Sequence, residues 1–210
     1  MPDERLLDGL NPAQYDAVVH EGGPLLVVAG AGSGKTRVLT HRIAHLIEQG
    51  LSPFEILAIT FTNKAAREMR ERLNRMYPDL DPMPLLATFH GFGLRLLREE
   101  HSLCGLRSRF PIYDDSDVNG VLTETVRDLA GMNTADARVD EVKGTISRWK
   151  SEFLSPEKAL ESSIDPFEEL CARSFLRYID RMRGLNAVDF DDLIHLPVKL
   201  LEENEEVARR

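Results

Sequence analysis

The sequence has few of the features that mark secreted, metal-binding or membrane proteins. It holds only two cysteines, Cys104 and Cys171, whose spacing fits neither a disulfide scaffold nor a zinc knuckle. We expect both to be buried thiols in a reducing compartment. No stretch approaches the roughly 18 consecutive apolar residues of a membrane span, and the N-terminus lacks the basic and apolar regions of a signal peptide. These absences predict a soluble cytoplasmic protein without membrane contact.

Positive charge is also scarce. The chain has 26 Lys and Arg against 35 Asp and Glu, a net charge of -9, which argues against coating nucleic acid through bulk charge. Local patches remain possible, and segment 62–75 is locally basic. Its arginines Arg67, Arg70 and Arg75 are more often a solvated helix face than a DNA surface. Hydrophobic residues make up 42% and charged residues 29% of the chain, as in folded globular proteins.

The first half of the chain alternates predicted strands and helices. Apolar runs at 24–29, 56–61 and 85–89 are typical of strands buried on both faces of a parallel sheet. A helix is expected before the first run and after each of them, over 12–21, 34–49, 65–76 and 89–103. This order predicts an α/β fold with a parallel sheet and right-handed crossovers.

The second half shows only helical periodicity. Helices are expected over 116–130, 139–153, 156–162, 166–183 and 189–208, with stops at Gly131 and Gly184, a kink at Pro197 and a linker-like stretch over 132–138. The sequence therefore predicts an α/β domain over 1–110 and an all-helical sub-domain over 111–210.

One motif carries recognisable chemistry. Residues 29–36 (AGAGSGKT) fit the phosphate-binding loop, with alanine in place of its first glycine, and stand between a predicted strand and helix. Such a loop turns backbone N–H groups toward phosphate oxygens at a helix N-terminus, while its lysine reaches the β- and γ-phosphates and its threonine ligates Mg²⁺. The alternative is a glycine-rich turn with a chance lysine. The predicted phosphate contacts are Gly30, Ala31, Gly32, Ser33, Gly34, Lys35 and Thr36, and Thr36 is the predicted Mg²⁺ ligand.

The loop alone does not name the reaction. A GTPase would need a guanine-reading Asn-Lys-x-Asp, and residues 63–66 (NKAA) lack the aspartate. The Ser-Gly-Gly-Gln signature of transporter-type ATPases is absent. A small nucleotide kinase fits the length, although nothing resembles its arginine-rich lid.

Five ordered segments narrow the choice. The segments 10–14 (LNPAQ), 29–37 (AGAGSGKTR), 59–69 (ITFTNKAAREM), 88–92 (TFHGF) and 188–193 (VDFDDL) together resemble the N-terminal part of superfamily 1 DNA helicases of the UvrD/Rep/PcrA type. The resemblance implies a P-loop NTPase (RecA-like) sheet with helices on both faces, ATP and Mg²⁺ as cofactors, and 3′ to 5′ translocation on single-stranded DNA. It further implies work at the nucleoid in DNA repair or replication, on a single strand or a single/double-strand junction.

The resemblance also assigns residues. It implies that Gln14 reads adenine, whose N6/N7 edge can pair with an amide, and that Arg37 lies close to the nucleotide. Either could instead be an ordinary surface residue. It implies DNA contacts at Phe61, Thr62, Asn63, Thr88, His90 and Gly91. The alternatives are core packing for Phe61 and Phe89 and a helix-capping role for His90.

The acidic segment 188–193 does not fit a magnesium motif. Such a motif follows a buried apolar strand, and residues 185–188 (LNAV) are too few and too polar. Asp189 is expected to cap the last helix. The implied acidic Asp-Glu pair and second motor domain of the family are not in these 210 residues.

We therefore expect the N-terminal portion of an ATP-dependent DNA helicase, most of domains 1A and 1B, that hydrolyses ATP poorly without the C-terminal motor domain and exposes sheet edges. Two alternatives remain: a non-catalytic, nucleotide-dependent DNA-binding or regulatory module complete at 210 residues, and a small phosphotransferase.

Overall fold

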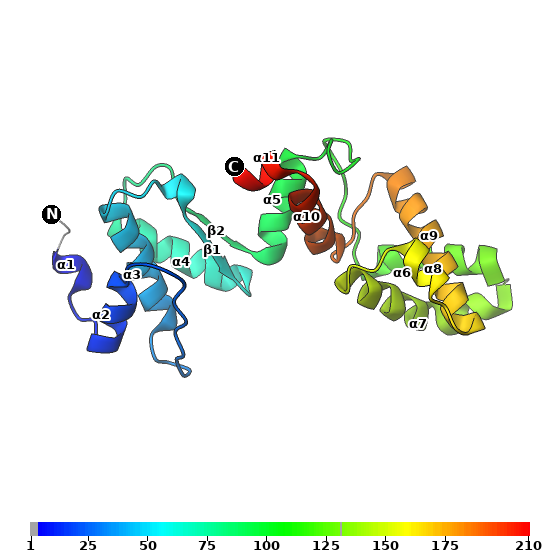
Figure 1. Cartoon of the computed structure of the whole chain (residues 1–210), viewed down its shortest axis with the longest axis horizontal. Helices are drawn as coiled ribbons and strands as arrows, with labels where there is room; N and C mark the ends of the chain where they lie inside the picture. Colours follow the sequence, from blue (N-terminus) through cyan, green and yellow to red (C-terminus); the bar gives the residue numbers. More distant parts are fainter. Residues whose placement is uncertain (1–3, 131) are drawn as a thin grey trace. The chain divides into compact units, whose positions relative to one another are not determined.

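The computed structural model describes residues 4–130 and 132–210, which form two compact units that divide between Phe89 and His90 (Figure 1). The domain boundary expected at residue 110 stays a prediction. None of the described helices is both long enough and apolar enough to cross a membrane.

The first unit is a small α/β arrangement. Its elements are α1 (Glu4–Leu7), α2 (Pro12–Val19), α3 (Lys35–Glu48), a 3₁₀ turn η1 (Pro53–Glu55), β1 (Leu57–Thr60), α4 (Asn63–Met76) and β2 (Leu85–Thr88). β1 and β2 pair in parallel with α4 as their crossover, and the register runs from Leu57 opposite Leu85 to Thr60 opposite Thr88. The core buries side chains from α3, α4 and both strands, among them Ile43, Met69, Leu73 and Leu86.

The strand predicted for residues 24–29 does not form. The segment is irregular, and its apolar side chains face solvent, with Leu26 87% and Val28 89% exposed. A parallel strand buries its faces only when neighbouring strands and helices cover it. Within the described residues the sheet contains β1 and β2 alone, and neither pairs with this segment. The composition of the segment suits a buried strand, but no neighbouring strand among the described residues pairs with it.

The second unit is built from helices. They are α5 (Phe89–Glu99), α6 (Asp115–Ala130), α7 (Met132–Ser151), α8 (Pro156–Glu161), α9 (Pro166–Leu185), α10 (Asp192–Glu203) and α11 (Glu205–Arg209). α6, α7 and α9 enclose the main core, where Leu122, Val142, Trp149, Phe175 and Tyr178 are buried. A smaller cluster joins α5 to α10 through Leu97 and Leu193.

Several predicted boundaries were wrong. The linker-like stretch 132–138 belongs to α7, since its sequence contains no helix-breaking residue. α9 continues through Gly184 and ends at Asn186, whose left-handed backbone (φ 53°) terminates the helix in place of glycine. α5 ends at Glu99 and is followed by tight turns rather than continuing to residue 103.

The C-terminal helices and the two cysteines agree with the predictions only in part. Pro197 lies inside α10, and the helical tail predicted over 189–208 is divided into α10 and α11 at Asn204. Cys171 is buried as predicted, whereas Cys104 is only half-buried. The predicted helix stop at Gly131 lies outside the described residues.

Candidate nucleotide and DNA site

The glycine-rich loop leads directly into α3. Gly32 and Gly34 have positive φ angles of 77° and 89°, which glycine adopts without strain. Gly34 is the N-cap of α3, and no side chain caps this helix. Backbone N–H groups at an uncapped N-terminus, together with the helix dipole, favour an anion. These two features suit an anion at the start of α3, and phosphate binding by the loop stays a prediction.

The lysine of the motif folds back over the loop. Its Nζ donates to the backbone oxygens of Ala29 at 3.0 Å and Gly30 at 2.6 Å. The Ser33 hydroxyl donates to the same Gly30 oxygen at 2.7 Å. These bonds place the Lys35 ammonium at the mouth of the loop. Thr36 is half-buried in the first turn of α3, and its backbone oxygen accepts a hydrogen bond from the Thr40 hydroxyl.

Gln14 is tied to this loop from α2. Asn11 and Gln14 form a reciprocal capping box, in which each backbone N–H donates to the other residue's side chain, at 2.9 and 3.1 Å. The remaining amide nitrogen of Gln14 donates to the backbone oxygen of Ser33 at 3.0 Å. A Cβ on Gly34 would lie 2.8 Å from that nitrogen. A larger residue at position 34 would therefore displace the end of the Gln14 side chain from its present position.

Arg37 also points toward the N-terminal segment. Its guanidinium donates to the backbone oxygen of Asp8 at 3.4 Å. The structure therefore brings together α2, residues 8–9 and the first turn of α3, as a nucleotide-binding role for Gln14 and Arg37 requires. Their contact with a nucleotide stays a prediction.

The ends of β1 and β2 bring three predicted DNA residues together. Thr62 caps α4 by accepting the Ala65 N–H at 3.1 Å. The Thr88 hydroxyl, from the end of β2, donates to the Asn63 side-chain oxygen at 3.4 Å. Parallel strands place their carboxyl ends at one edge, where open α/β sheets bind ligands. This edge is polar and accessible at Thr62 and Asn63.

Phe61 stands at the same edge with its ring in solvent. The side chain is 96% exposed, and that of Phe89 is 61% exposed. Core packing, the alternative considered for both, is therefore wrong for this chain. An exposed aromatic ring beside hydrogen-bonding groups suits base stacking.

His90 and Gly91 lie in the first turn of α5, in the second unit. The His90 ring packs edge-on against Phe190, with the ring centroids 6.4 Å apart. Their role in DNA binding stays a prediction.

The basic face of α4 is engaged with its surroundings. Arg67 lies 3.9 Å from Glu71, and Arg75 donates to the backbone oxygen of Glu71 at 3.2 Å. Arg70 donates to the backbone oxygen of Leu86 in β2 at 3.1 Å, which ties helix to strand. The bonds of Arg70 and Arg75 favour a structural role for these two arginines, whereas the exposed Arg67–Glu71 pair contributes little.

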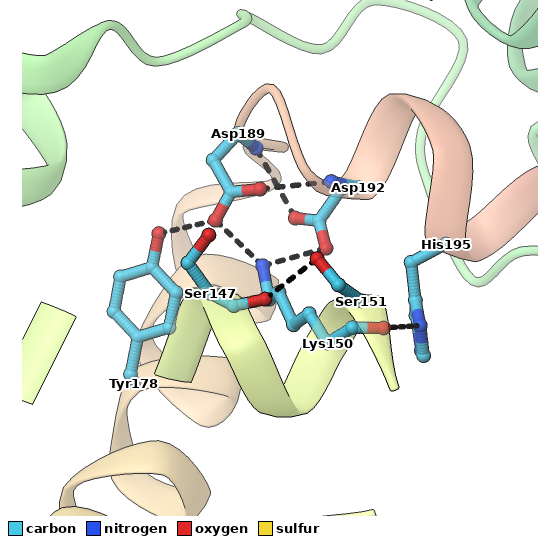
Figure 2. A network of polar contacts seen from close by, with 7 residues as sticks. All are labelled: Ser147, Lys150, Ser151, Tyr178, Asp189, Asp192 and His195. Atoms are coloured by element: carbon cyan, nitrogen blue, oxygen red, sulfur yellow. Dashed lines mark hydrogen bonds and ion pairs between the residues drawn. The ribbon is translucent and has the colours of Figure 1, made fainter. Parts of the chain in front are cut away.

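Sequence reasoning missed a buried charge network in the second unit (Figure 2). The Lys150 ammonium donates to Asp189 at 2.6 Å and to Asp192 at 2.8 Å. The Tyr178 hydroxyl donates to Asp189 at 2.7 Å, and His195 lies 3.2 Å from the Lys150 backbone oxygen. The signal in the sequence was a lysine in register with the apolar face of α7, four residues after Ile146.

Electrostatics favour the ionised forms of Lys150 and Asp189 in this network. Burial by itself lowers the pKa of Lys150, but the two carboxylates outweigh it and raise the pKa. Burial likewise opposes ionisation of Asp189, yet the Lys150 charge and the bonds from Lys150 and Tyr178 hold its pKa below the usual range. Burial and the neighbouring Asp189 raise the pKa of Asp192. Burial and Asp189 also raise the pKa of Tyr178, so it stays a donor.

The acidic segment therefore has a structural use. Asp189 accepts the backbone N–H of Asp192, the first residue of α10, at 2.9 Å, and Asp192 accepts that of Asp189 at 3.1 Å. Asp189 therefore accepts the first N–H of α10, as a capping side chain does, but the N-cap position itself is occupied by Asp191 and not by Asp189 as predicted. Among residues 4–130 and 132–210 no group of three or more Asp, Glu, His or Cys side chains could hold a metal ion.

Comparison with known proteins decides the family. The family model for the UvrD/REP helicase N-terminal domain matches residues 10–210. The chain belongs to the UvrD/Rep helicase family. This confirms the resemblance inferred from the five segments.

Relatives within the UvrD/Rep family match nearly all of this chain but are much longer than it. The chain is 41% identical over 203 residues to the ATP-dependent DNA helicase Rep of Escherichia coli K12, which covers 96% of this chain and 30% of Rep. It is 44% identical over 213 residues to the ATP-dependent DNA helicase UvrD1 of Mycobacterium tuberculosis H37Rv, and the match covers 99% of this chain and 28% of UvrD1. It is 40% identical over 206 residues to the ATP-dependent DNA helicase PcrA of Staphylococcus aureus Mu50, and that match covers 96% of this chain and 28% of PcrA. The chain thus spans less than a third of the length of these relatives.

Proposed function

We propose that these 210 residues are the N-terminal ATP- and DNA-binding portion of an ATP-dependent DNA helicase that translocates 3′ to 5′ on single-stranded DNA. The observation that carries the proposal is the loop between Ala29 and Thr36. It combines positive-φ glycines, an uncapped helix N-terminus and a lysine poised at its mouth. Three relatives carry the name ATP-dependent DNA helicase. In this proposal the first unit is part of a P-loop NTPase sheet, and residues 111–210 form the helical sub-domain.

The nucleotide would bind with its phosphates against the first turn of α3. Lys35 would exchange the carbonyls of Ala29 and Gly30 for the β- and γ-phosphates, since a charge-assisted bond to phosphate is stronger than one to a neutral carbonyl. Gln14 would face the base, and Arg37 would flank the phosphates from the first turn of α3.

Magnesium fits the loop as a partner of the nucleotide. Thr36 offers one hydroxyl ligand, and Mg²⁺ usually completes its shell with phosphate oxygens and water. When bound, Mg²⁺ neutralises charge that develops on the transferred phosphoryl group. Because no acidic pair stands near Thr36 in this sequence, we propose that the chain binds ATP and turns it over negligibly, with or without DNA.

Single-stranded DNA would cross the carboxyl edge of β1 and β2. Phe61 would stack a base, while Thr62, Asn63 and Thr88 would hold the backbone. His90 and Gly91, at the start of the second unit, are proposed as further DNA contacts. In the whole helicase the substrate would be a single strand or its junction with a duplex, the C-terminal motor domain would complete the ATPase site, and the work would take place at the nucleoid in repair or replication.

Calorimetric titration with ATP tests the proposal. Lys35→Ala should weaken ATP binding about tenfold to a hundredfold, the value of one charge-assisted contact. Lys158→Ala, which removes the same charge from an exposed position in the second unit, should leave the affinity unchanged. Equal ATP affinity in a folded Lys35→Ala variant would show that the loop does not bind phosphate.

A further inference from the structure

An acid-free segment in the second unit carries two unpaired arginines. Residues 101–113 contain no Asp or Glu, although the chain holds 35 of them. Arg107 and Arg109 are exposed in this segment. In the part of the chain that the structure describes, neither takes part in an ion pair, unlike Arg95, Arg173 and Arg209 of the same unit. The segment therefore carries two exposed positive charges that no ion pair among the described residues neutralises.

A buried asparagine fixes this segment in place. Asn186 follows α9 with a positive φ of 53°, and its side chain is bonded at both ends. Its oxygen accepts the Arg107 backbone N–H at 2.7 Å, and its nitrogen donates to the Arg109 backbone oxygen at 2.9 Å. We call these two bonds the Asn186 latch. They hold the backbone on either side of Ser108 while both guanidinium groups remain in solvent.

A short ladder extends the attachment. Ile112 pairs with Val188 in a parallel bridge, with bonds from Tyr113 to Val188 at 2.8 Å and from Val188 to Pro111 at 3.2 Å. The backbone around the arginines is thus ordered before any ligand binds. Ordering that is already present reduces the entropic cost of binding.

A third arginine lies beside the latch. Arg183 is in the last turn of α9, and its backbone oxygen accepts the Asn186 N–H at 3.0 Å. Its side chain is exposed, with Asp180 3.9 Å away. An exposed pair at that distance contributes little, so Arg183 remains available to an anion.

We propose that Arg107, Arg109 and Arg183 form a second DNA contact surface, which binds the phosphodiester backbone without reading bases. A guanidinium group is positively charged and can donate two parallel hydrogen bonds to the oxygens of a negatively charged phosphate. The surface rests on the proposed function, because DNA is the polyanion that the first unit is proposed to bind. It differs from the edge at Phe61 in offering only charge, so its contribution depends strongly on salt.

The test is fluorescence anisotropy of the 210-residue chain with mixed-sequence single-stranded and duplex DNA over a range of salt concentrations. Substituting Arg107→Gln, Arg109→Gln and Arg183→Gln together should weaken binding at least about tenfold and reduce the salt slope by about 3, or about one per phosphate contact. The matched control substitutes Arg95→Gln, Arg173→Gln and Arg209→Gln, which removes the same charge from ion-paired positions.

Equal losses in the two triple variants would overturn the surface and leave the proposed function standing. Absence of saturable DNA binding by the unsubstituted chain would overturn both the surface and the proposed function.

Asn186→Gly tests the latch separately, because it keeps every charge and the left-handed helix end but removes the two latch bonds. It should weaken DNA binding in the folded variant, as checked by thermal melting. Unchanged affinity would show that the latch does not position the arginines.

Discussion

The side-chain nitrogen of Gln14 lies 3.0 Å from the backbone oxygen of Ser33, so that a residue of α2 holds the middle of the glycine-rich loop. The oxygen of the same amide caps α2 through Asn11. Both ends of the amide are thus engaged within the protein. Reading an adenine edge would require at least one of these bonds to be exchanged, which ties base recognition to the shape of the loop.

This relationship predicts the effect of Gln14→Ala. The preference for ATP over GTP should fall about tenfold, within the range of a lost bidentate amide–adenine pair. Asn11→Ala is the matched control, because it breaks the same capping box at a cost of about 1 kcal/mol while keeping the amide. Competition of ATP and GTP against a labelled nucleotide measures both. If Gln14→Ala weakens the two nucleotides equally, Gln14 does not read the base.

Phe61→Ala should separate DNA binding from stability. The ring is almost fully exposed, so its removal should change the free energy of unfolding by less than about 0.5 kcal/mol. Loss of a stacked base should weaken single-strand binding by about five- to a hundredfold, with ATP affinity unchanged. Phe54→Ala removes an 81% exposed ring elsewhere in the first unit and should change neither property. Equal DNA affinity in the Phe61 and Phe54 variants would exclude stacking at Phe61.

Gly93→Ala should be among the most damaging substitutions in the second unit. A Cβ there would lie 1.9 Å from the backbone oxygen of Leu193, so α5 and α10 would have to separate. We expect a loss of at least about 2 kcal/mol, since backbone cannot move aside as a side chain can. Gly120→Ala, on an open face of α6, should instead stabilise by about 0.5–1 kcal/mol. Urea unfolding that gives both variants the same midpoint would contradict this packing.

The buried pair of Lys150 and Asp189 predicts how the stability of this chain depends on pH. In the unsubstituted chain, the contribution of Lys150 is present below the ordinary lysine pKa of about 10.4 and is lost as pH rises through its higher folded value. The contribution of Asp189 is present above about 3.9 and is lost as pH falls through its lower folded value. Stability from this pair should therefore be level between about pH 5 and 9.

Lys150→Met leaves two facing carboxylates buried without a cation. The variant should lose about 3–5 kcal/mol at neutral pH. Its folded carboxylates should bind a proton more tightly than the unfolded ones, so its stability should increase as pH falls from 7 to 5. Adding Asp189→Asn and Asp192→Asn should abolish that dependence. Urea unfolding at several pH values measures the slopes, and a flat profile for Lys150→Met would contradict the network.

The sequence predicts those features of the structure that depend on residues close together in the chain, and it misses those that depend on residues far apart. The loop at Lys35 was recognised in the sequence because its glycines and lysine act on their immediate neighbours. The strand predicted over 24–29 was wrong because burial is decided by elements elsewhere in the chain. The link between Lys150 and Asp189 joins residues 39 positions apart, and no short-range pattern fixes that pairing.

The irregular segment over 24–28 offers a reporter for assembly of the sheet. In the structure its backbone N–H groups donate to no other backbone group, whereas those of α3 and α4 are held in helical bonds. Deuterium should therefore enter this segment within the shortest labelling times and enter the helices much later. Any chain that supplies a neighbouring strand would slow exchange at Leu25 to Val28 first. Mass spectrometry of that peptide thus reads completion of the sheet directly, without any measurement of nucleotide or DNA.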